Sequence, residues 1–421
     1  ELLGVEVLAV QAAAELLDRK SEHRPVVGEV VHEPLAHGWR HLEDFVAQLL
    51  QQIRGLLHGR AGRVLRAGAV HRIGDQSDAQ PAVVRWGTQR GAVYLADQKL
   101  PVQVPRVRDL AAGAEVPLAT YAALQTPRSQ DVGLFRRVLG GLSPREYEAA
   151  AEAVPEAFGL ARSSVSRRFI RASARELRQL QERRLDDAAW LVLVLDGKTF
   201  AGDQLVVALG VTATGEKRIL GLVQTASENK RVLASFLRDL GERGFPLDQP
   251  LLAVLDGAKG LRAAVRAVLG DIPVQRCQWH KRENVVSHLA KREQPTWRRR
   301  LQAAYAQPTY AAAKRALTRL HHELHLRNAS AAASLAEGVE ETLTLHRLGV
   351  AAELGASLKT TNLIESVMAR LEAKTHRVTR WRTSDQKLRW CAAALWAMER
   401  HFRRVKGFRH LPLLKQALTT K

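Results

Sequence analysis

Two apolar runs of the chain each end in Leu-Asp-Gly, and this repeated pattern constrains the fold more than any other feature. Residues 191–195 (LVLVL) lead into Asp196, and residues 251–255 (LLAVL) lead into Asp256. Runs this rich in Val and Leu are typical of strands buried on both faces of a sheet. An ionised carboxylate at a strand tip needs water, a cation or a hydrogen-bond donor. The two runs therefore predict paired carboxylates suited to a hard cation such as Mg2+, although Asp-Gly also simply turns a chain after a strand.

The charge of the chain indicates its kind of partner. The 421 residues include 64 Lys and Arg against 43 Asp and Glu, a formal net charge of +21. This excess argues for a polyanion, most plausibly nucleic acid. Two cysteines provide no disulfide framework, so we expect a reducing, cytoplasmic location. No apolar run is long enough for a membrane span, so we expect no membrane partner.

The first 130 residues divide into two predicted segments. Residues 1–80 are poorly defined, with one amphipathic helix expected at 42–57, and we assign them no function; our hypothesis is that they are poorly ordered or not native to the family. Residues 81–130 read as a small β-rich unit, because residues 83–108 alternate apolar and polar side chains around turn signals. A β-rich linker is the alternative.

Residues 131–185 predict a helix-turn-helix DNA-binding region. One helix would begin at Ser143-Pro144 and end near Pro155, which restarts a short helix before a turn at Gly159. The next helix would begin at Ala161, with Val165 and Phe169 facing inward. The side chains expected to point at DNA are Ser163, Ser164, Ser166, Arg167, Arg168 and Arg171. An ordinary basic helical hairpin is the alternative.

Residues 186–290 predict an α/β catalytic core with a mixed sheet. Three strands joined by short turns form an antiparallel meander, and helix, strand, helix and short strand follow. This order of elements is that of the RNase-H-like fold, in which acidic residues lie on the first and fourth strands. Asp196 and Asp256 fall on those two strands.

Cys277 and His280 follow the last strand of this core. Their spacing fits half of a zinc site, but no second pair is evident, so we favour a structural role. Residues 291–355 are rich in Arg, Lys and His and are predicted to form an all-α insertion.

Residues 356–421 are predicted to complete the core and add basic helices. Thr361 or Asn362 can cap a helix, with Glu365 in its first turn. Taken alone, Glu365 is a capping-box glutamate; beside Asp196 and Asp256 it supplies the third carboxylate of a two-cation site. Downstream, aromatic residues alternate with Arg and Lys, a composition that suits DNA contacts and an amphipathic helix equally.

Together these motifs resemble the mutator-type bacterial insertion-sequence transposases, a DDE family. The resemblance covers about residues 83–413 and depends on three motifs: Asp196-Gly-Lys, Leu255-Asp-Gly-Ala-Lys-Gly with Cys277-Gln-Trp-His, and Thr361-Asn-Leu-Ile-Glu-Ser. It implies an RNase-H-like catalytic domain interrupted by a helical insertion, and it maps the catalytic, metal-binding triad onto Asp196, Asp256 and Glu365. The family's Cys-x-x-His signature maps onto Cys277 and His280.

The resemblance implies cleavage and joining of DNA at element ends with Mg2+, for which Mn2+ can substitute. The expected partners are terminal inverted repeats and target DNA, bound by a homodimer or larger assembly in a bacterial, nucleoid-associated setting. Further DNA contacts are predicted for Lys198, Lys259, Arg380 and Trp381. Two alternatives stay open: a non-catalytic helix-turn-helix repressor, and an RNase-H-like nuclease without strand transfer.

Overall fold

The structure, a computed structural model, describes residues 83–95, 98–125, 128–150, 158–225 and 229–420. This part of the chain divides into two units, which we describe separately: residues 83–93 and 100–125 belong to the first, and the remaining described residues belong to the second. Among these residues, no helix is long and apolar enough to span a membrane.

The first unit is built on a three-stranded sheet of order β1-β2-β3. Its elements are β1 (Val83–Leu95), β2 (Gln98–Asp109), β3 (Ala114–Glu115) and helix α3 (Ala119–Leu124). Val104, Val107 and Leu118 form its small core. The strands expected at residues 83–108 are therefore present.

The second unit contains a five-stranded mixed sheet of order β6-β5-β4-β7-β8. Its strands are β4 (Trp190–Phe200), β5 (Asp203–Thr212), β6 (Lys217–Thr225), β7 (Leu252–Leu255) and β8 (Val274–Arg276). The first three form the predicted antiparallel meander. Strands β7 and β8 run parallel to β4, because each is reached through a crossover helix. The predicted mixed α/β class is confirmed.

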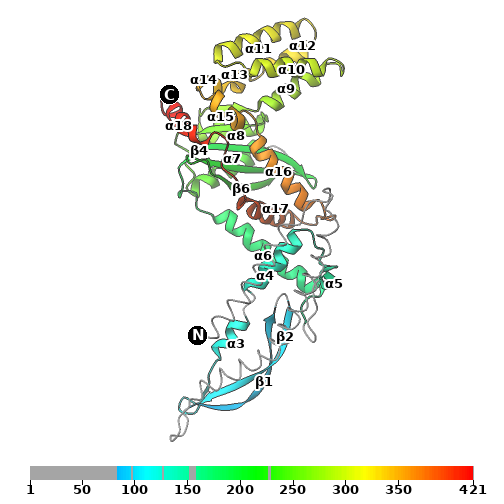
Figure 1. The fold of residues 1–421 in the computed structure, drawn as a ribbon, viewed down its shortest axis with the longest axis vertical. Coiled ribbons are helices and arrows are strands. Elements are labelled where there is room, and N and C mark those ends of the chain that lie inside the picture. Colours follow the sequence, from blue (N-terminus) through cyan, green and yellow to red (C-terminus); the bar gives the residue numbers. More distant parts are fainter. Residues whose placement is uncertain (1–82, 96–97, 126–127, 151–157, 226–228, 421) are drawn as a thin grey trace, which may run out of the picture. The chain divides into compact units, whose positions relative to one another are not determined.

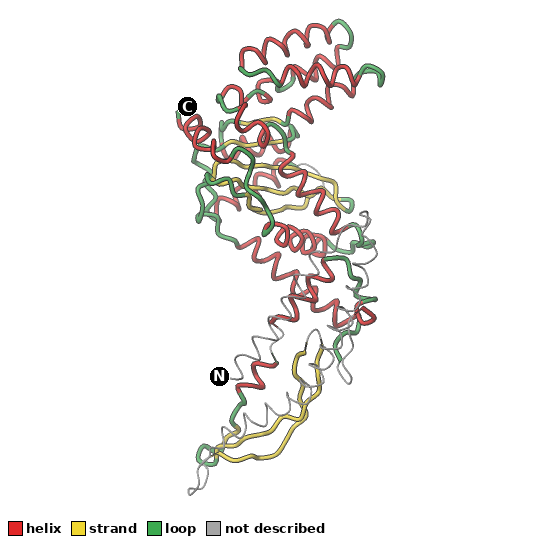
Figure 2. Tube along the Cα trace, in the orientation of Figure 1, coloured by secondary structure: helices red, strands yellow, loops and turns green. Residues whose placement is uncertain are grey.

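Helices cover both faces of this sheet (Figures 1 and 2). Because side chains alternate along a strand, Val192 and Val194 pack on one side of β4, and Leu193 and Leu195 on the other. The first face is covered by α6 (Arg162–Glu182), α16 (Asn362–Thr375) and α17 (Ser384–Glu399). The second face is covered by α7 (Lys230–Glu242) and α8 (Lys259–Leu269). Burial on both faces explains why the β4 run is apolar without interruption.

A helical group between β8 and α16 has its own core and spans residues 278–342, whereas the sequence predicted an all-α insertion at residues 291–355. It is built from α9 (Gln278–Ser287), α10 (Gln294–Tyr305), α11 (Tyr310–His325), α12 (Ala329–Ala336) and α13 (Val339–Thr342). The remaining helices of the second unit are α4 (Arg128–Leu139), α5 (Tyr147–Ala150), α14 (Thr344–Arg347), α15 (Ala351–Leu358), η1 (Phe408–His410) and α18 (Leu411–Thr419).

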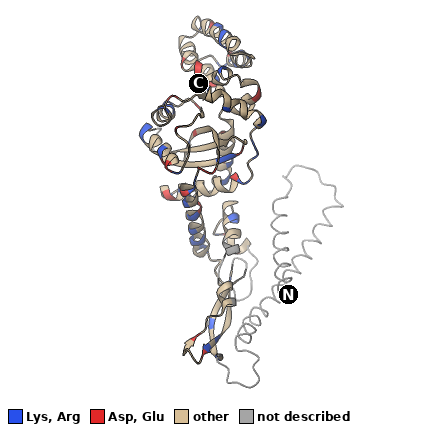
Figure 3. Cartoon of the chain, turned by 90° about the vertical axis from the view of Figure 1, so that its left-hand side faces the viewer, with Lys and Arg blue, Asp and Glu red and all other residues tan. Residues whose placement is uncertain are grey.

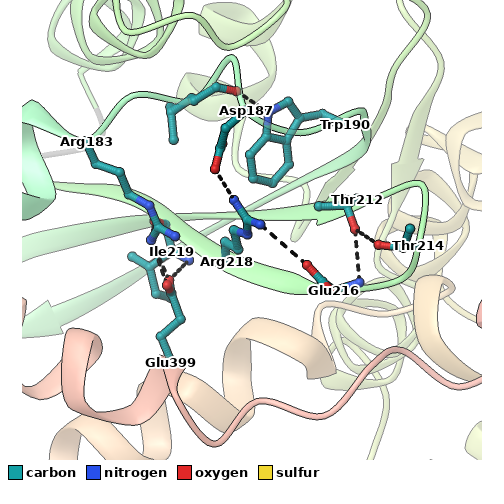
Figure 4. Close-up of polar contacts among 10 residues, drawn as sticks. Arg183, Asp187, Trp190, Thr212, Thr214, Glu216, Arg218, Ile219 and Glu399 are labelled. Carbon is teal, nitrogen blue, oxygen red and sulfur yellow. Dashed lines mark hydrogen bonds and ion pairs between the residues drawn. The ribbon is translucent and has the colours of Figure 1, made fainter.

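A carboxylate at the end of α17 joins two helices to the edge of the sheet (Figure 4). Glu399 accepts hydrogen bonds from Arg183, at the end of α6, with Nη1–Oε1 at 2.7 Å, and from the backbone N–H of Ile219 in β6 at 2.6 Å. Both side chains of this ion pair are more than four-fifths buried, where such charge-assisted bonds are screened least. The end of α6 is thereby fixed to β6.

One predicted boundary in this unit is wrong. The helix expected to begin at Ser143-Pro144 begins at Tyr147. The Ser143 hydroxyl accepts from the N–H of Arg145, and its carbonyl accepts from Glu146, so these residues form a turn before the helix. The segment 1–80, with its expected helix at 42–57, lies outside the described residues. The short helix expected from Pro155 to Phe158 also lies outside them, except for Phe158 itself.

We predict that Leu193→Ala lowers the free energy of unfolding by about 2–5 kcal/mol, because its side chain is fully buried between β4 and the α7–α8 layer and its loss leaves a cavity. Leu326→Ala is the matched control, since Leu326 is 87% exposed and its truncation should cost less than about 0.5 kcal/mol. Urea unfolding followed by circular dichroism measures both; similar losses would contradict the described packing.

Candidate functional site

The parallel pairing of β4 with β7 places Asp196 and Asp256 next to each other, because Leu195 pairs with Leu255 and the two aspartates are the next residues along the chain. Asp256 follows the end of β7 as expected, but Asp196 is not at a strand tip, because β4 continues to Phe200 and Asp196 pairs with Val207 of β5. Asp196 is buried, with 7% of its surface exposed, and Asp256 is half-buried. The Asp256 carboxylate also accepts a hydrogen bond from the N–H of Ala258 at 2.9 Å, so it turns the chain as well.

Glu365 lies in the first turn of α16, as expected from its sequence context. Thr361 occupies the N-cap position but makes no side-chain capping bond. Its hydroxyl instead donates to Glu365 Oε1 at 2.5 Å, because residues four apart share one face of the helix start. Of the two expected capping residues, Thr361 holds the N-cap position, but its side chain orients the glutamate and does not cap the helix.

Cys277 and His280 connect this glutamate to the end of β8. The Cys277 sulfur accepts hydrogen bonds from the backbone N–H groups of His280 and Thr361, each at 3.5 Å. His280 Nδ1 lies 3.9 Å from Glu365 Oε1 and 3.4 Å from the Thr361 hydroxyl. The pair therefore connects the start of α16 to the end of β8.

Burial and neighbouring charge alter the ionisation of this cluster. Burial, together with the Asp256 and Glu365 carboxylates, raises the pKa of Asp196 to about 7, although His280 opposes the shift. The hydrogen bond with Cys277 raises the pKa of His280 to about 9, with Glu365 and Asp256 adding to the shift. Although burial acts against it, hydrogen bonding from His280 and Thr361 lowers the pKa of the Cys277 thiol. The site is thus an acidic cluster with one histidine that favours its cationic form.

The ligand atoms of Cys277, His280 and Glu365 all lie within 4.8 Å of one another. Among the described residues, these three form the group whose ligand atoms are close enough to bind a single metal ion. Asp196, Asp256 and Glu365 do not form so tight a group. They nevertheless lie near enough for their charges to act on one another, since both partners raise the pKa of Asp196.

The α6 residues predicted to contact DNA differ in their exposure. Ser163, Arg167 and Arg171 are exposed, and Ser164 and Ser166 are half-buried. Arg168 is only 9% exposed, so it does not point outward as expected. Position 168 falls on the inner face of the helix, three residues after the fully buried Val165, and helical spacing explains the error.

The four other predicted DNA contacts also have distinct surroundings. Lys198 pairs with Glu372 on α16, whereas Lys259 and Arg380 are exposed. Trp381 packs against the rings of Phe200, with centroids 5.0 Å apart, and Trp390, at 6.3 Å. Trp381 therefore packs against neighbouring rings, and it lies before α17, outside the amphipathic helix that was its alternative.

Comparison with known proteins identifies the family of this chain. Residues 62–404 match the family described as Transposase, Mutator family. The match includes part of the segment to which we assigned no function. The chain therefore belongs to the Mutator family of transposases.

Individual relatives are all bacterial. A transposase for insertion sequence element IST2 of Acidithiobacillus ferrooxidans is 34% identical over 35% of this chain and 47% of its own length, so the chain spans about half of that relative. A transposase for IS6120 of Mycolicibacterium smegmatis is 29% identical over 56% of this chain and 74% of its own. A transposase for IS406 of Burkholderia multivorans is 28% identical over 73% and 80%, respectively.

We predict that Asp196 makes the stability of the protein fall with rising pH in EDTA. Its pKa rises from 3.8 in the unfolded chain to about 7 in the folded one, so the folded state holds the proton longer. Its contribution to the free energy of unfolding is therefore lost as the pH rises from 3.8 to about 7. The total change is roughly 4 kcal/mol, at 1.36 kcal/mol for each pH unit.

Urea unfolding of the wild type and of Asp196→Asn across this range isolates the effect, because the other titrating groups are present in both proteins. The difference between the two curves should change steadily over the window. Parallel curves would show that Asp196 has an ordinary pKa.

Proposed function

We propose that this protein is a DNA transposase that cleaves and joins the ends of an insertion sequence, using Asp196, Asp256 and Glu365 as a catalytic triad. The observation that carries the proposal is the pairing of Leu195 with Leu255, which places the two aspartates next to each other. The names of the relatives support the reaction class. The strand order β6-β5-β4-β7-β8, with the antiparallel meander before the parallel strands, supports an RNase-H-like fold.

The triad fits a hard divalent cation. Carboxylate oxygens are the ligands that Mg2+ prefers, and the pKa of Asp196 is raised first by its burial and then by the neighbouring Asp256 and Glu365 carboxylates. Asp196, Asp256 and Glu365 would hold Mg2+, or Mn2+ in its place. When bound, the cations would polarise the phosphodiester and activate the attacking hydroxyl. Such ions can lie about 4 Å apart, so three carboxylates need not converge on a single ion.

The protein's own residues then orient the triad and bind DNA. Thr361 orients Glu365, and Cys277 fixes the backbone from which both project. Asp196 must release its proton to bind a cation, so binding should be weaker in mild acid. Lys and Arg, spread over the helices of the described chain, would offset repulsion between these carboxylates and DNA phosphates (Figure 3).

DNA partners and assembly follow from this activity. The proposed substrates are terminal inverted repeats and target DNA, and two ends brought together require at least a dimer. Helix α6 is the proposed recognition element of a helix-turn-helix, with Ser163, Arg167 and Arg171 at its exposed face.

Substitution of Asp196 by Asn tests the catalytic assignment. We expect loss of cleavage and strand transfer by about a thousandfold or more, because a cation ligand worth several kcal/mol is removed. Binding to element ends should stay near the wild-type level. Cleavage and joining are measured on a labelled, pre-cleaved element end, which also distinguishes a transposase from a nuclease that cuts without joining. Retained cleavage in Asp196→Asn would refute the triad.

Calorimetric titration with Mn2+ separates the transposase from a non-catalytic repressor. The wild type should release heat and protons near neutral pH, and Asp196→Asn should not. Equal signals from the two proteins would favour the repressor.

We further predict that Thr361→Val slows cleavage by roughly 10–100-fold, as expected when a group that orients a metal ligand is lost. Thr361 is fully buried, and valine keeps its shape while removing the hydroxyl that donates to Glu365. Thr361→Ser retains that hydroxyl and should restore most of the rate. The Mn2+ affinity of both variants gives an independent readout. If serine is as damaging as valine, Thr361 acts through packing alone.

A further inference from the structure

A basic groove runs along α8, beside the proposed triad. This groove, of about 590 Å³, is lined by side chains from α7, α8 and the end of the helical insertion. We call it the α8 groove and define it by Lys230, Lys259, Arg262, Arg266, Glu337 and Glu341. Gly257, which follows Asp256 directly, also lines it. The groove therefore begins one residue from the proposed triad.

Helical spacing places the basic side chains of α8 in one row. Lys259, Arg262 and Arg266 stand at positions i, i+3 and i+7, which share a face of the helix. All three are exposed, and Lys230 at the start of α7 adds a fourth positive charge. Lys230, Lys259 and Arg266 have no ion-pair partner among the described residues, so their charges are available to a ligand.

The two acidic side chains of the groove are already paired. Glu341 accepts from Arg262, and Glu337 lies 3.4 Å from both Arg276 and Lys281. The groove therefore keeps a positive charge after its internal pairs are counted. A ligand with repeated negative charge fits this lining better than a neutral or cationic one.

A buried arginine forms part of the wall of the groove, next to Asp256. Arg276 is 6% exposed and lines the groove, and its Nε has no hydrogen-bond partner among the described residues. The two Nη atoms of Arg276 contact Glu337, so its charge is already paired and only the Nε lacks an acceptor. Gly257 lets the Arg276 side chain pack against the backbone next to Asp256, because a Cβ there would lie 2.2 Å from this Nε.

We propose that the α8 groove binds the phosphodiester backbone of the DNA strand whose reacting phosphate lies at the triad. The position of the reacting phosphate in this inference rests on the proposed function. The binding of DNA to the α8 groove does not depend on it. Lys259 to Arg266 span about 10 Å of helix at 1.5 Å per residue. A DNA strand advances about 3.4 Å along its axis per phosphate, so the row matches about three phosphates. Contacts of this kind position DNA without reading its sequence.

The test is DNA binding by the full chain in EDTA, where cleavage is absent. Fluorescence anisotropy with a labelled duplex is measured between about 50 and 200 mM salt. The double variant Lys259→Gln/Arg266→Gln should lower the salt slope by about 1.8 and weaken binding by about 60-fold at 0.1 M salt, from loss of two phosphate contacts. Both side chains are exposed, so the variant should fold.

Arg315→Gln/Arg319→Gln is the matched control, because it removes two exposed arginines from α11, outside the groove. Its binding should change little. Glu341→Gln should act in the opposite direction and tighten binding, by about eightfold at 0.1 M salt, because it releases Arg262 for a phosphate.

Three results would overturn the proposal. Unchanged binding in the Lys259/Arg266 variant would leave an acidic protein segment as the better occupant. Equal weakening in the α11 control would indicate a general charge effect, and weaker binding in Glu341→Gln would show that this glutamate is structural. None of these results depends on cleavage, so the triad is tested separately by Asp196→Asn.

Discussion

The parallel pairing of β4 with β7 is the interaction on which the rest of the structure depends. It aligns Leu195 with Leu255 and so determines where both following aspartates emerge. Because a strand alternates its side chains, a slip of one residue would exchange the layer against α6, α16 and α17 for the layer against α7 and α8. Both layers are apolar and closely packed, so the register of the sheet and the position of the carboxylates are fixed together.

The site combines two opposing physical demands. In the proposed function its carboxylates have to be near one another to share cations, yet burial and proximity disfavour ionisation, as the pKa of Asp196 at about 7 shows. Hydrogen bonds satisfy the remaining polar groups: Thr361 donates to Glu365, and Cys277 receives two backbone N–H groups. The cluster is thus held by the protein in a form that would become more favourable when a cation binds.

Positive charge matters in this chain both as a net excess and as a local row of side chains in the α8 groove. The large net charge favours a polyanionic partner at long range but does not specify a path for it. The α8 groove gives such a path, because a row of cations begins beside Asp256 and a buried arginine forms part of its wall. The exposed face of α6 offers a second surface in the same unit, with Arg167 and Arg171 accessible and Arg168 turned inward.

Much of the fold could be predicted from sequence because its signals are local. The apolar runs before Asp196 and Asp256, the turn at residues 212–215 and the crossover before β7 defined a mixed sheet, and Glu365 was correctly placed in the first turn of a helix. Local signals failed where a residue has competing partners. Ser143 forms a turn instead of capping a helix, Arg168 lies on the inner face of α6, and Trp381 packs against Phe200 and Trp390.

The sequence by itself identified the candidate site residues Asp196, Asp256, Glu365, Cys277 and His280, because apolar runs, helix starts and Cys-x-x-His spacing each extend over only a few positions. Only the tertiary structure decided that Thr361 binds Glu365, that Cys277 fixes the start of α16, and that Arg276 meets Gly257 in the wall of the α8 groove. The last two of these contacts join segments far apart in the chain, and the first depends on how α16 begins. These two contacts arise when the sheet and its helices pack together, and no periodicity along the sequence encodes them, whereas the Thr361–Glu365 contact follows the four-residue spacing of a helix start.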